Sequence, residues 1–306
     1  MKYIKNIISF ILVYMLSIPV VFSAEYKIAV RAHHGISATY EQWGATVELL
    51  NNEIPRHSFD LVPVIDLNEL SRRVGDGEFD YVLTNPSSYV EIELLYGAEA
   101  IATLNNKRAG KAQDQFGSVI FTHIKNKNIL NIKDLKGKTV MAVSEPAFGG
   151  WRVAWFEMLS QGLDPYSDLK KLMFTKTGLQ QDVVRGVLNG KAQVGVVRTG
   201  KLESMEAGGE IDMRYLRIIN NNDIKNFPFF LSTKLYPEWV FSSAQSTDLA
   251  IKQKVKNVLQ SIMADSPAAL EGKYIGWVSP RDYGSVRKLM QRLKVGPYKH
   301  NYRKTR

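Results

Sequence analysis

Five polar turns carry the side chains of this chain that are best suited to chemistry. Each turn follows an apolar, strand-like run, contains Gly or Pro, and opens a helical segment. The turns span residues 31–35, 84–88, 144–150, 175–178 and 198–200. A helix that begins at such a turn offers unpaired N–H groups and a partial positive charge, both of which attract anions. The turns therefore predict a site for a small anionic ligand at the carboxyl ends of strands.

Catalytic and metal-binding motifs are not found beside these turns. The chain has no cysteine and five histidines, and neither an HExxH nor a Gly-x-Ser-x-Gly pattern occurs. His33 and His34 are adjacent, so in a strand they would face opposite ways, and we expect solvent-facing or indirect roles for them. We therefore expect a binding protein without catalytic residues, metal or cofactor.

The N-terminus has the features of a secretory signal. Lys2 and Lys5 precede an uncharged, mostly apolar run that ends at Phe22, and Val21 and Ser23 suit the −3 and −1 positions of a cleavage site. We expect a signal peptide over residues 1–23 and a periplasmic location, with an uncleaved anchor as the alternative. The formal net charge is +10. In an exported protein we expect this positive field to favour anionic ligands, not nucleic acid.

Strand-like and helical segments alternate in two similar sets. Apolar runs predict strands at residues 26–30, 59–64, 79–83, 101–104, 118–121, 139–143, 172–174, 194–197 and 215–219. The alternation predicts two α/β lobes, one formed by residues 25–117 plus 218–306 and the other by residues 118–217. Two crossings between the lobes would make a hinge, and a ligand would bind between them.

Two helix starts are marked by capping residues. Thr39 followed by Gln42 is a capping-box pattern, which predicts a helix that opens at Thr39. Asn85 lies where an N-cap belongs, with Pro86 at the first helical position.

Longer segments resemble the phosphonate-binding family of periplasmic solute-binding proteins. They lie, in order, at residues 40–43, 79–90, 134–138 and 183–195. The resemblance implies a two-lobe, type II periplasmic binding protein with a hinge and a ligand cleft. A narrower resemblance, to the sensor regions of tetrathionate-responsive histidine kinases, lies at residues 148–151, 197–203, 235–239, 276–278 and 293–298.

In those kinases a membrane span and a kinase follow the sensor region, whereas this sequence ends at Arg306. We therefore expect a free, monomeric periplasmic module. It would pass its ligand to an ABC permease or present it to a separate membrane histidine kinase.

The resemblance places a small oxyanion between the lobes. Tyr40 and Trp43 would supply a wall and a hydroxyl, and Arg198 a planar, charged donor, with Arg31 as a second candidate. The remaining expected donors are Thr84, Asn85, Ser87, Ser88, Ser144, Gly149, Gly150, Thr177 and Gln180.

Arg198 stands where phosphonate binders often have an acid, and residues 179–181 replace their Ser-His-Asp. Arg198 favours a ligand that is anionic at both ends, such as tetrathionate, over an aminophosphonate; a phosphonate-like or phosphate-like ligand is the alternative. We expect Arg198→Ala to abolish binding with little loss of fold.

Structural roles compete with each of these expectations. Ser, Thr and Asn at helix starts can be caps, Gly149 and Gly150 can serve a tight turn, and Arg198 can pair with Glu203 or Glu145. Trp43 and Trp151 can belong to the core, which is the commoner place for a tryptophan. An enzyme on the same fold and a sensor remnant without ligand are the alternative functions.

Overall fold

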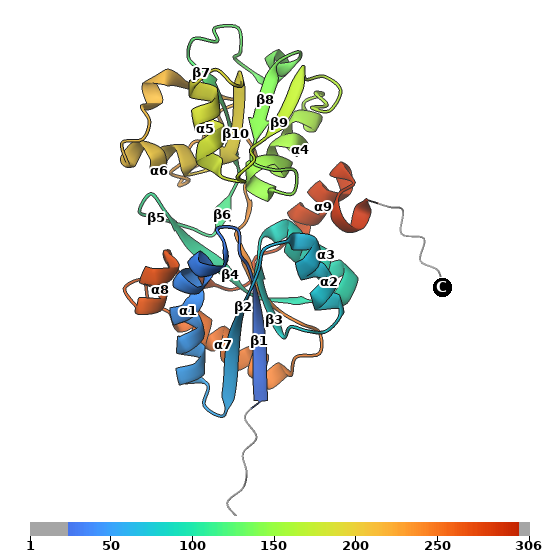
Figure 1. Ribbon diagram of the computed structural model, residues 1–306, viewed down its shortest axis with the longest axis vertical. Coiled ribbons are helices and arrows are strands. Elements are labelled where there is room, and N and C mark those ends of the chain that lie inside the picture. The colour runs from blue at the N-terminus through green and yellow to red at the C-terminus, as the bar shows by residue number, and fades with distance from the viewer. Residues whose placement is uncertain (1–23, 300–306) are drawn as a thin grey trace, which may run out of the picture.

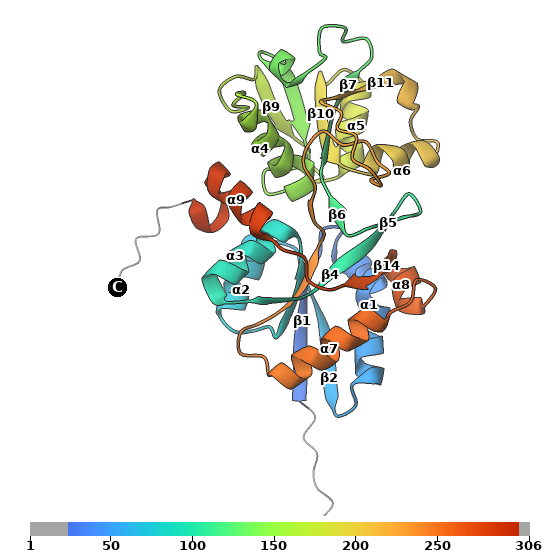
Figure 2. The same cartoon turned by 180° about the vertical axis from the view of Figure 1, so that it is seen from behind.

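The computed structural model describes residues 24–299, so the expected signal peptide lies outside the described residues. Two α/β lobes follow one another along the long axis of the molecule, each with its own sheet (Figures 1 and 2). The α/β class expected from the alternating segments is therefore confirmed.

The first lobe is built on a mixed sheet with the strand order β14-β4-β13-β3-β1-β2, and β5 pairs with β4. Its strands are β1 Ala24–Arg31, β2 His57–Val64, β3 Tyr81–Thr84, β4 Glu99–Arg108, β5 Lys111–Gln113, β13 Val240–Ser243 and β14 Tyr274–Val278. β1 runs parallel to β2 and β3, whereas β13 is antiparallel to β3 and β4. The β1 residues Ile28, Ala29 and Val30 are all buried, as expected for a strand covered on both faces.

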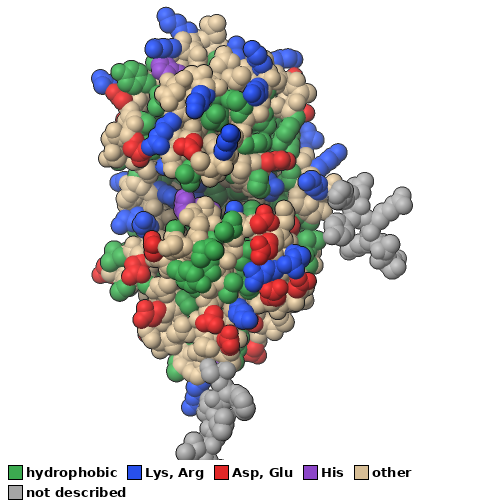
Figure 3. All heavy atoms as spheres, in the orientation of Figure 1, with side chains coloured by type: hydrophobic (Ala, Val, Ile, Leu, Met, Phe, Trp, Pro, Cys, Tyr) green, Lys and Arg blue, Asp and Glu red, His purple; other side chains and the backbone are tan. Residues whose placement is uncertain are grey.

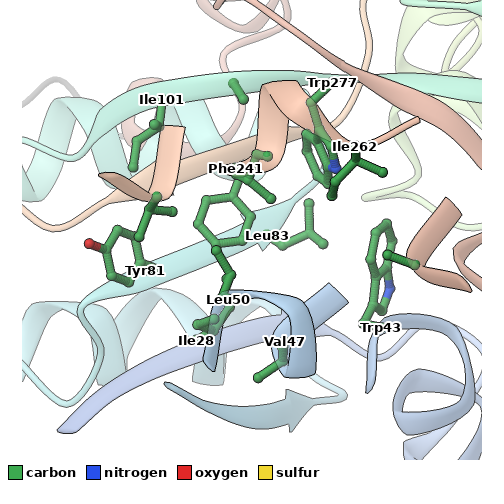
Figure 4. Close-up of a cluster of buried hydrophobic side chains, with 14 of the residues drawn as sticks. Ile28, Trp43, Val47, Leu50, Tyr81, Leu83, Ile101, Phe241, Ile262 and Trp277 are labelled. Carbon is green, nitrogen blue, oxygen red and sulfur yellow. The ribbon is translucent and has the colours of Figure 1, made fainter. Parts of the chain in front are cut away.

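Helices cover both faces of this sheet. They are α1 Ile36–Glu53, α2 Leu67–Gly75, α3 Pro86–Tyr96, α7 Leu249–Ser261, α8 Pro267–Gly272 and α9 Gly284–Leu293. α1, α7 and α8 pack on one face, where Trp43, Leu50, Phe241 and Trp277 lie among the buried apolar side chains (Figure 4). α2 and α3 pack on the other face.

The start of α1 differs from the capping-box prediction. The helix begins at Ile36 after Gly35, whose φ of 95° lies in the region that favours glycine. The Thr39 hydroxyl donates to the Gly35 carbonyl oxygen at 2.8 Å, so it bonds back along the helix and caps no N–H group. The prediction was wrong because the glycine turn starts the helix one turn earlier.

The second lobe has the strand order β11-β7-β10-β8-β9. Its elements are β7 Ser118–His123, β8 Thr139–Ala142, α4 Val153–Ser160, β9 Lys171–Phe174, α5 Gln180–Leu188, β10 Val194–Arg198, α6 Lys201–Ala207 and β11 Leu216–Ile219. A π-helical turn, Phe148–Arg152, precedes α4. β8 is parallel to β9 and β10, whereas β7 is antiparallel to β10 and β11.

The chain crosses between the lobes at two adjacent segments. β6, Gln115–Phe116, and β12, Tyr236–Pro237, pair antiparallel with each other. The second lobe extends past the expected boundary at residue 217, because β11 continues to Ile219 and the Ser232 amide donates to the Ser118 carbonyl oxygen at 2.9 Å. The return to the first lobe therefore comes at β12.

Candidate functional site

Basic side chains at the ends of four elements gather between the lobes. Arg31 is the last residue of β1, Arg108 of β4 and Arg198 of β10, and Lys201 is the first residue of α6. A groove separates the lobes on the face in Figure 3, with histidine and Lys or Arg side chains at its edges. Both lobes thus contribute positive charge to one region.

These cations act on one another. Burial, then the charge of Arg198, lowers the pKa of Arg108 to about 10, and Glu238 only partly offsets this. Burial also lowers the pKa of Lys201, where Glu210 opposes the effect and Arg108 adds to it. Burial lowers the pKa of Arg31, against the attraction of Asp66. The region is therefore short of negative charge, which is a property of anion sites.

Two histidines follow Arg31 in the same region. The rings of His33 and His34 lie 4.0 Å apart between centroids, and His33 lies 5.0 Å from the ring of Trp239. Desolvation by the groove walls lowers the pKa of His33, and His34, Arg108 and Arg31 lower it further.

The pKa of His34 is lowered by desolvation and then by Arg108, Lys201 and Lys273. Both histidines remain solvent-accessible, as expected from the sequence. They are neutral near pH 7 and can gain charge when an anion is present.

Arg198 is held by its own surroundings. Its Nη2 pairs with Oε1 of Glu238, which is completely buried, and its guanidinium lies 4.0 Å from the centre of the Phe116 ring. Asn106 Nδ2 donates to the same Oε1 at 2.6 Å, and the Trp239 amide donates to Oε2 at 2.7 Å. Neither Glu203 nor Glu145, the partners considered from the sequence, forms this ion pair; the acid comes from the return crossing.

Several buried polar atoms at the ends of strands lack a partner. Within residues 24–299 they include Nη1 of Arg31, Nε of Arg108, Nε of Arg198 and Oγ1 of Thr84. A buried donor without a partner costs about 1–3 kcal/mol, more when charged, so native proteins rarely keep one without a reason. A bound anion would accept from these donors.

The turn at residues 84–88 has the expected helix start. Oδ1 of Asn85 accepts from the amides of Ser87 and Ser88 at 3.0 and 3.1 Å, and Pro86 is the first residue of α3, so the predicted cap is confirmed. The Ser87 hydroxyl also donates to Asn85. Thr84 is the member of this turn whose hydroxyl is buried and unpartnered.

The glycines of the turn at residues 144–150 are sites of close packing. A Cβ on Gly149 would lie 2.6 Å from the Phe116 ring and 3.2 Å from Cγ of Arg198, and one on Gly150 would lie 2.6 Å from Val143. Gly149 therefore lets the turn approach the Arg198 side chain. Ser144 is partly exposed at the start of the same turn.

Thr177 and Gln180 have partners within the second lobe. The Thr177 hydroxyl bonds to the Asp182 carboxylate and accepts from the Leu179 amide. Oε1 of Gln180 accepts from the Arg198 amide at 2.7 Å. Gln180 therefore positions the end of β10.

The two aromatic residues expected at the wall lie apart from each other. Tyr40 is half exposed on α1, whereas Trp43 is 3% exposed and stacks on Tyr274 at 5.7 Å. Trp43 points into the core of the first lobe (Figure 4). The wall function expected of Trp43 is thus corrected, because its indole packs against Tyr274 and Trp277 in the core of the first lobe. Trp239 is the indole that lies beside His33.

Sequence reasoning missed Arg108, Lys201 and Glu238 as site residues. Lys201 and Glu238 lie in segments that carried the narrower resemblance, but no spacing rule singled them out. Arg108 precedes a turn formed by Ala109 and Gly110, both with positive φ. That Ala-Gly pair was the only local indication of a hairpin.

Among residues 24–299, no three His, Asp or Glu side chains are grouped closely enough to hold a metal ion. None of the helices in that range has both the length and the apolar character needed to cross a membrane.

Two lobes joined by paired crossings, with a groove of donors between them, define a type II periplasmic binding protein. A family model matches residues 32–283, and the family is that of the periplasmic substrate-binding proteins of phosphonate ABC transporters. The chain belongs to this family, which confirms the resemblance seen in the sequence.

The solved structure of PhnD1 from Prochlorococcus marinus in complex with methylphosphonate has a TM-score of 0.66 at 14% identity, covering 89% of this chain and 99% of that one. XAC2383 from Xanthomonas citri, bound to ATP, also has a TM-score of 0.66, at 18% identity, covering 90% and 97%. At these identities the similarity shows the fold alone.

One curated relative is the tetrathionate sensor histidine kinase TtrS of Salmonella typhimurium. It is 28% identical over 279 residues, which are 90% of this chain and 45% of the relative. The chain thus spans less than half the length of that kinase.

Proposed function

We propose that this periplasmic substrate-binding protein captures a small oxyanion in the groove between its lobes. The observation that carries the proposal is the set of buried, unpartnered donors on Arg31, Arg108 and Thr84. Burial and neighbouring cations also lower the pKa of Arg108 and of Lys201. Water alone satisfies such donors poorly once the groove closes, whereas an oxyanion satisfies both their charge and their hydrogen bonds.

Binding between lobes also explains how a ligand is held. Arg31, Thr84 and Arg108 belong to the first lobe, and Arg198 and Lys201 belong to the second. An anion that bridges the two sets attracts both, so it favours closure about the paired crossings. The closed form is then the signal for a downstream membrane protein.

Two ligand classes follow from the relatives. The tetrathionate sensor kinase supports a sulfur oxyanion, and membership of the phosphonate-binding family supports a phosphonate-like or phosphate-like ion. Tetrathionate is our first choice, because Arg198 stands where an acid would be needed to bind the amine of an aminophosphonate. Delivery goes to an ABC permease or to a separate membrane histidine kinase.

A thermal-shift titration tests the proposal. The purified protein is heated with tetrathionate, thiosulfate, sulfite, phosphate, phosphite or methylphosphonate at matched ionic strength. A ligand at about 100 times its Kd stabilises the folded state by about 2.7 kcal/mol, which raises Tm by roughly a few degrees. A shift with one of these anions supports capture. No shift with any of them rejects the proposal for these ligand classes, and turnover of a probe would favour an enzyme.

A further inference from the structure

We infer that Arg108, carried to the groove by the β4–β5 hairpin, recognises the anion and makes binding depend on a doubly charged ligand. The inference rests on the proposed function and deepens it, because it names the residue and the ligand charge class. It comes from the position of the hairpin, the partners of Glu238 and the unpartnered Nε of Arg108.

The hairpin projects out of the first lobe. Its tip is Ala109 and Gly110, with φ of 40° and 77°, the positive values that a tight two-residue turn requires. Arg108 pairs across the tip with Lys111. In Figures 1 and 2, β5 extends from the first lobe toward α6 of the second.

Arg108 touches the second lobe at Gly200. A Cβ built on Gly200 would lie 3.3 Å from Cβ of Arg108, and the φ of Gly200 is 80°, a conformation that side chains with a Cβ rarely adopt. Glycine at the start of α6 therefore admits the hairpin. The guanidinium of Arg108 is brought within the influence of Arg198, Lys201 and His34 by this contact.

Glu238, the acid that pairs with Arg198, bonds to three other groups and forms no hydrogen bond with Arg108. Oε1 of Glu238 already accepts from Asn106 and Arg198, and Oε2 accepts from the Trp239 amide. Asn106 and Arg108 are two residues apart on β4, so they lie on the same face of the strand. Asn106 reaches Glu238, whereas Nε of Arg108 is buried without a partner.

A ligand must therefore supply the missing negative charge. Arg198 is neutralised by Glu238, while Arg31, Arg108 and Lys201 form no ion pair within residues 24–299. A dianion compensates two of these positive charges, whereas a monoanion compensates one and leaves more charge desolvated without a partner. Guanidinium binds planar pairs of oxygens through two parallel hydrogen bonds, which suits sulfonate and phosphonate groups.

Three variants test the inference. Arg108→Met removes the charge and keeps much of the stem, Arg108→Lys keeps the charge and loses the fork, and Lys107→Met removes one charge from the exposed, opposite face of the same strand. Calorimetry measures the affinity of each for tetrathionate and for methanesulfonate, a one-charge probe. Thermal unfolding without ligand measures whether each variant is folded and how stable it is.

We expect Arg108→Met to weaken tetrathionate binding at least about tenfold. Its Tm should be unchanged or higher, because the substitution removes a partly buried cation that Arg198 repels. The tetrathionate affinity of Arg108→Lys should lie between those of Arg108→Met and the wild type. The affinity of Lys107→Met should stay within about twofold of the wild type. The wild type should bind tetrathionate more tightly than methanesulfonate. In Arg108→Met the ratio of the two affinities should be smaller.

Unchanged tetrathionate affinity in Arg108→Met would overturn the inference while leaving the proposed function intact. A lower Tm with unchanged affinity would show a purely structural role. If the wild type bound none of the six anions of the thermal-shift panel, the proposed function itself would fail. The two failures are therefore distinguishable.

Discussion

Arg198 and Glu238 form a buried ion pair that joins the central strand of the second lobe to the return crossing. Arg198 ends β10, and Glu238 follows β12 directly. The Tyr283 hydroxyl donates to the Glu238 carbonyl oxygen at 2.9 Å, so the first lobe also holds this residue. The pair thus connects one lobe, the crossing and the other lobe, and it fixes where Arg198 can meet a ligand.

This pair changes the expectation for Arg198→Ala. The substitution leaves the Glu238 carboxylate buried beside two remaining donors and without its cation. We predict that either Arg198→Ala or Glu238→Gln lowers the free energy of unfolding by about 3–5 kcal/mol, as measured by denaturant titration. The control is Glu210→Gln, which breaks the exposed pair with Arg185 and should cost about 0–1 kcal/mol. Equal effects of the buried and exposed changes would refute this role.

Substitutions of Asn85 distinguish its role as a helix cap from a role in ligand binding. We predict that Asn85→Ala lowers the free energy of unfolding by about 1 kcal/mol, since it removes the acceptor of two α3 amides. Asn85→Asp keeps the cap but adds a negative charge near Thr84, so stability should persist while tetrathionate affinity drops. Chemical denaturation and calorimetry measure the two effects. An aspartate variant with wild-type affinity would place the ligand away from this turn.

Gly149 is predicted to be intolerant of a methyl group. In Gly149→Ala the new Cβ meets the Phe116 ring and the Arg198 stem, so overpacking should cost about 1–3 kcal/mol of stability. Gly44→Ala is the matched control on α1, where nothing lies within 4 Å of an added Cβ. It should leave stability equal or raise it by up to about 1 kcal/mol. Thermal unfolding measures the stability of both variants. A Gly149→Ala variant as stable as the wild type would contradict the packing described.

Binding of a permanently charged anion should strengthen at lower pH. Desolvation and then cations hold the pKa of His33 and His34 below the ordinary 6.5, and an anion beside them raises it again. Ligand binding therefore takes up protons, and affinity for tetrathionate should increase as pH falls from 7.5 to 5.5. Calorimetry at both pH values measures this.

The histidines have the opposite effect on stability without ligand. Because their folded pKa is lowered, the unfolded chain binds more protons below pH 6.5, so the free energy of unfolding decreases as pH falls through that value. A His33→Gln, His34→Gln double variant should flatten both dependences. A pH dependence of affinity that survived in the double variant would have another origin.

Local sequence patterns were sufficient to predict most of the fold. The apolar runs located the parallel strands because a strand buried on both faces is nearly continuously apolar, as residues 194–197 are. Asn85 and Pro86 marked a helix start because their chemistry is local. The antiparallel strands β13 and β14 were not predicted, because their partners in the first sheet lie more than 100 residues away in the chain.

The site was only partly predictable for the same reason. Arg198 and Thr84 stand at strand ends, where position alone suggests a ligand role. Glu238 and Arg108 acquire their importance from a crossing and a hairpin that bring distant segments together. Trp43 was misplaced because a tryptophan near a helix start looks alike in sequence whether it faces core or groove.

An oxyanion bound between the lobes would accept hydrogen bonds from the unpartnered donors. The most direct test is a crystal structure with the anion that gives the largest thermal shift, located by sulfur or phosphorus anomalous scattering. We predict anion oxygens within about 3 Å of Arg108 Nε and Arg31 Nη1, with Arg198 still paired to Glu238. An anion bound outside the groove, with those nitrogens left unpartnered, would contradict it.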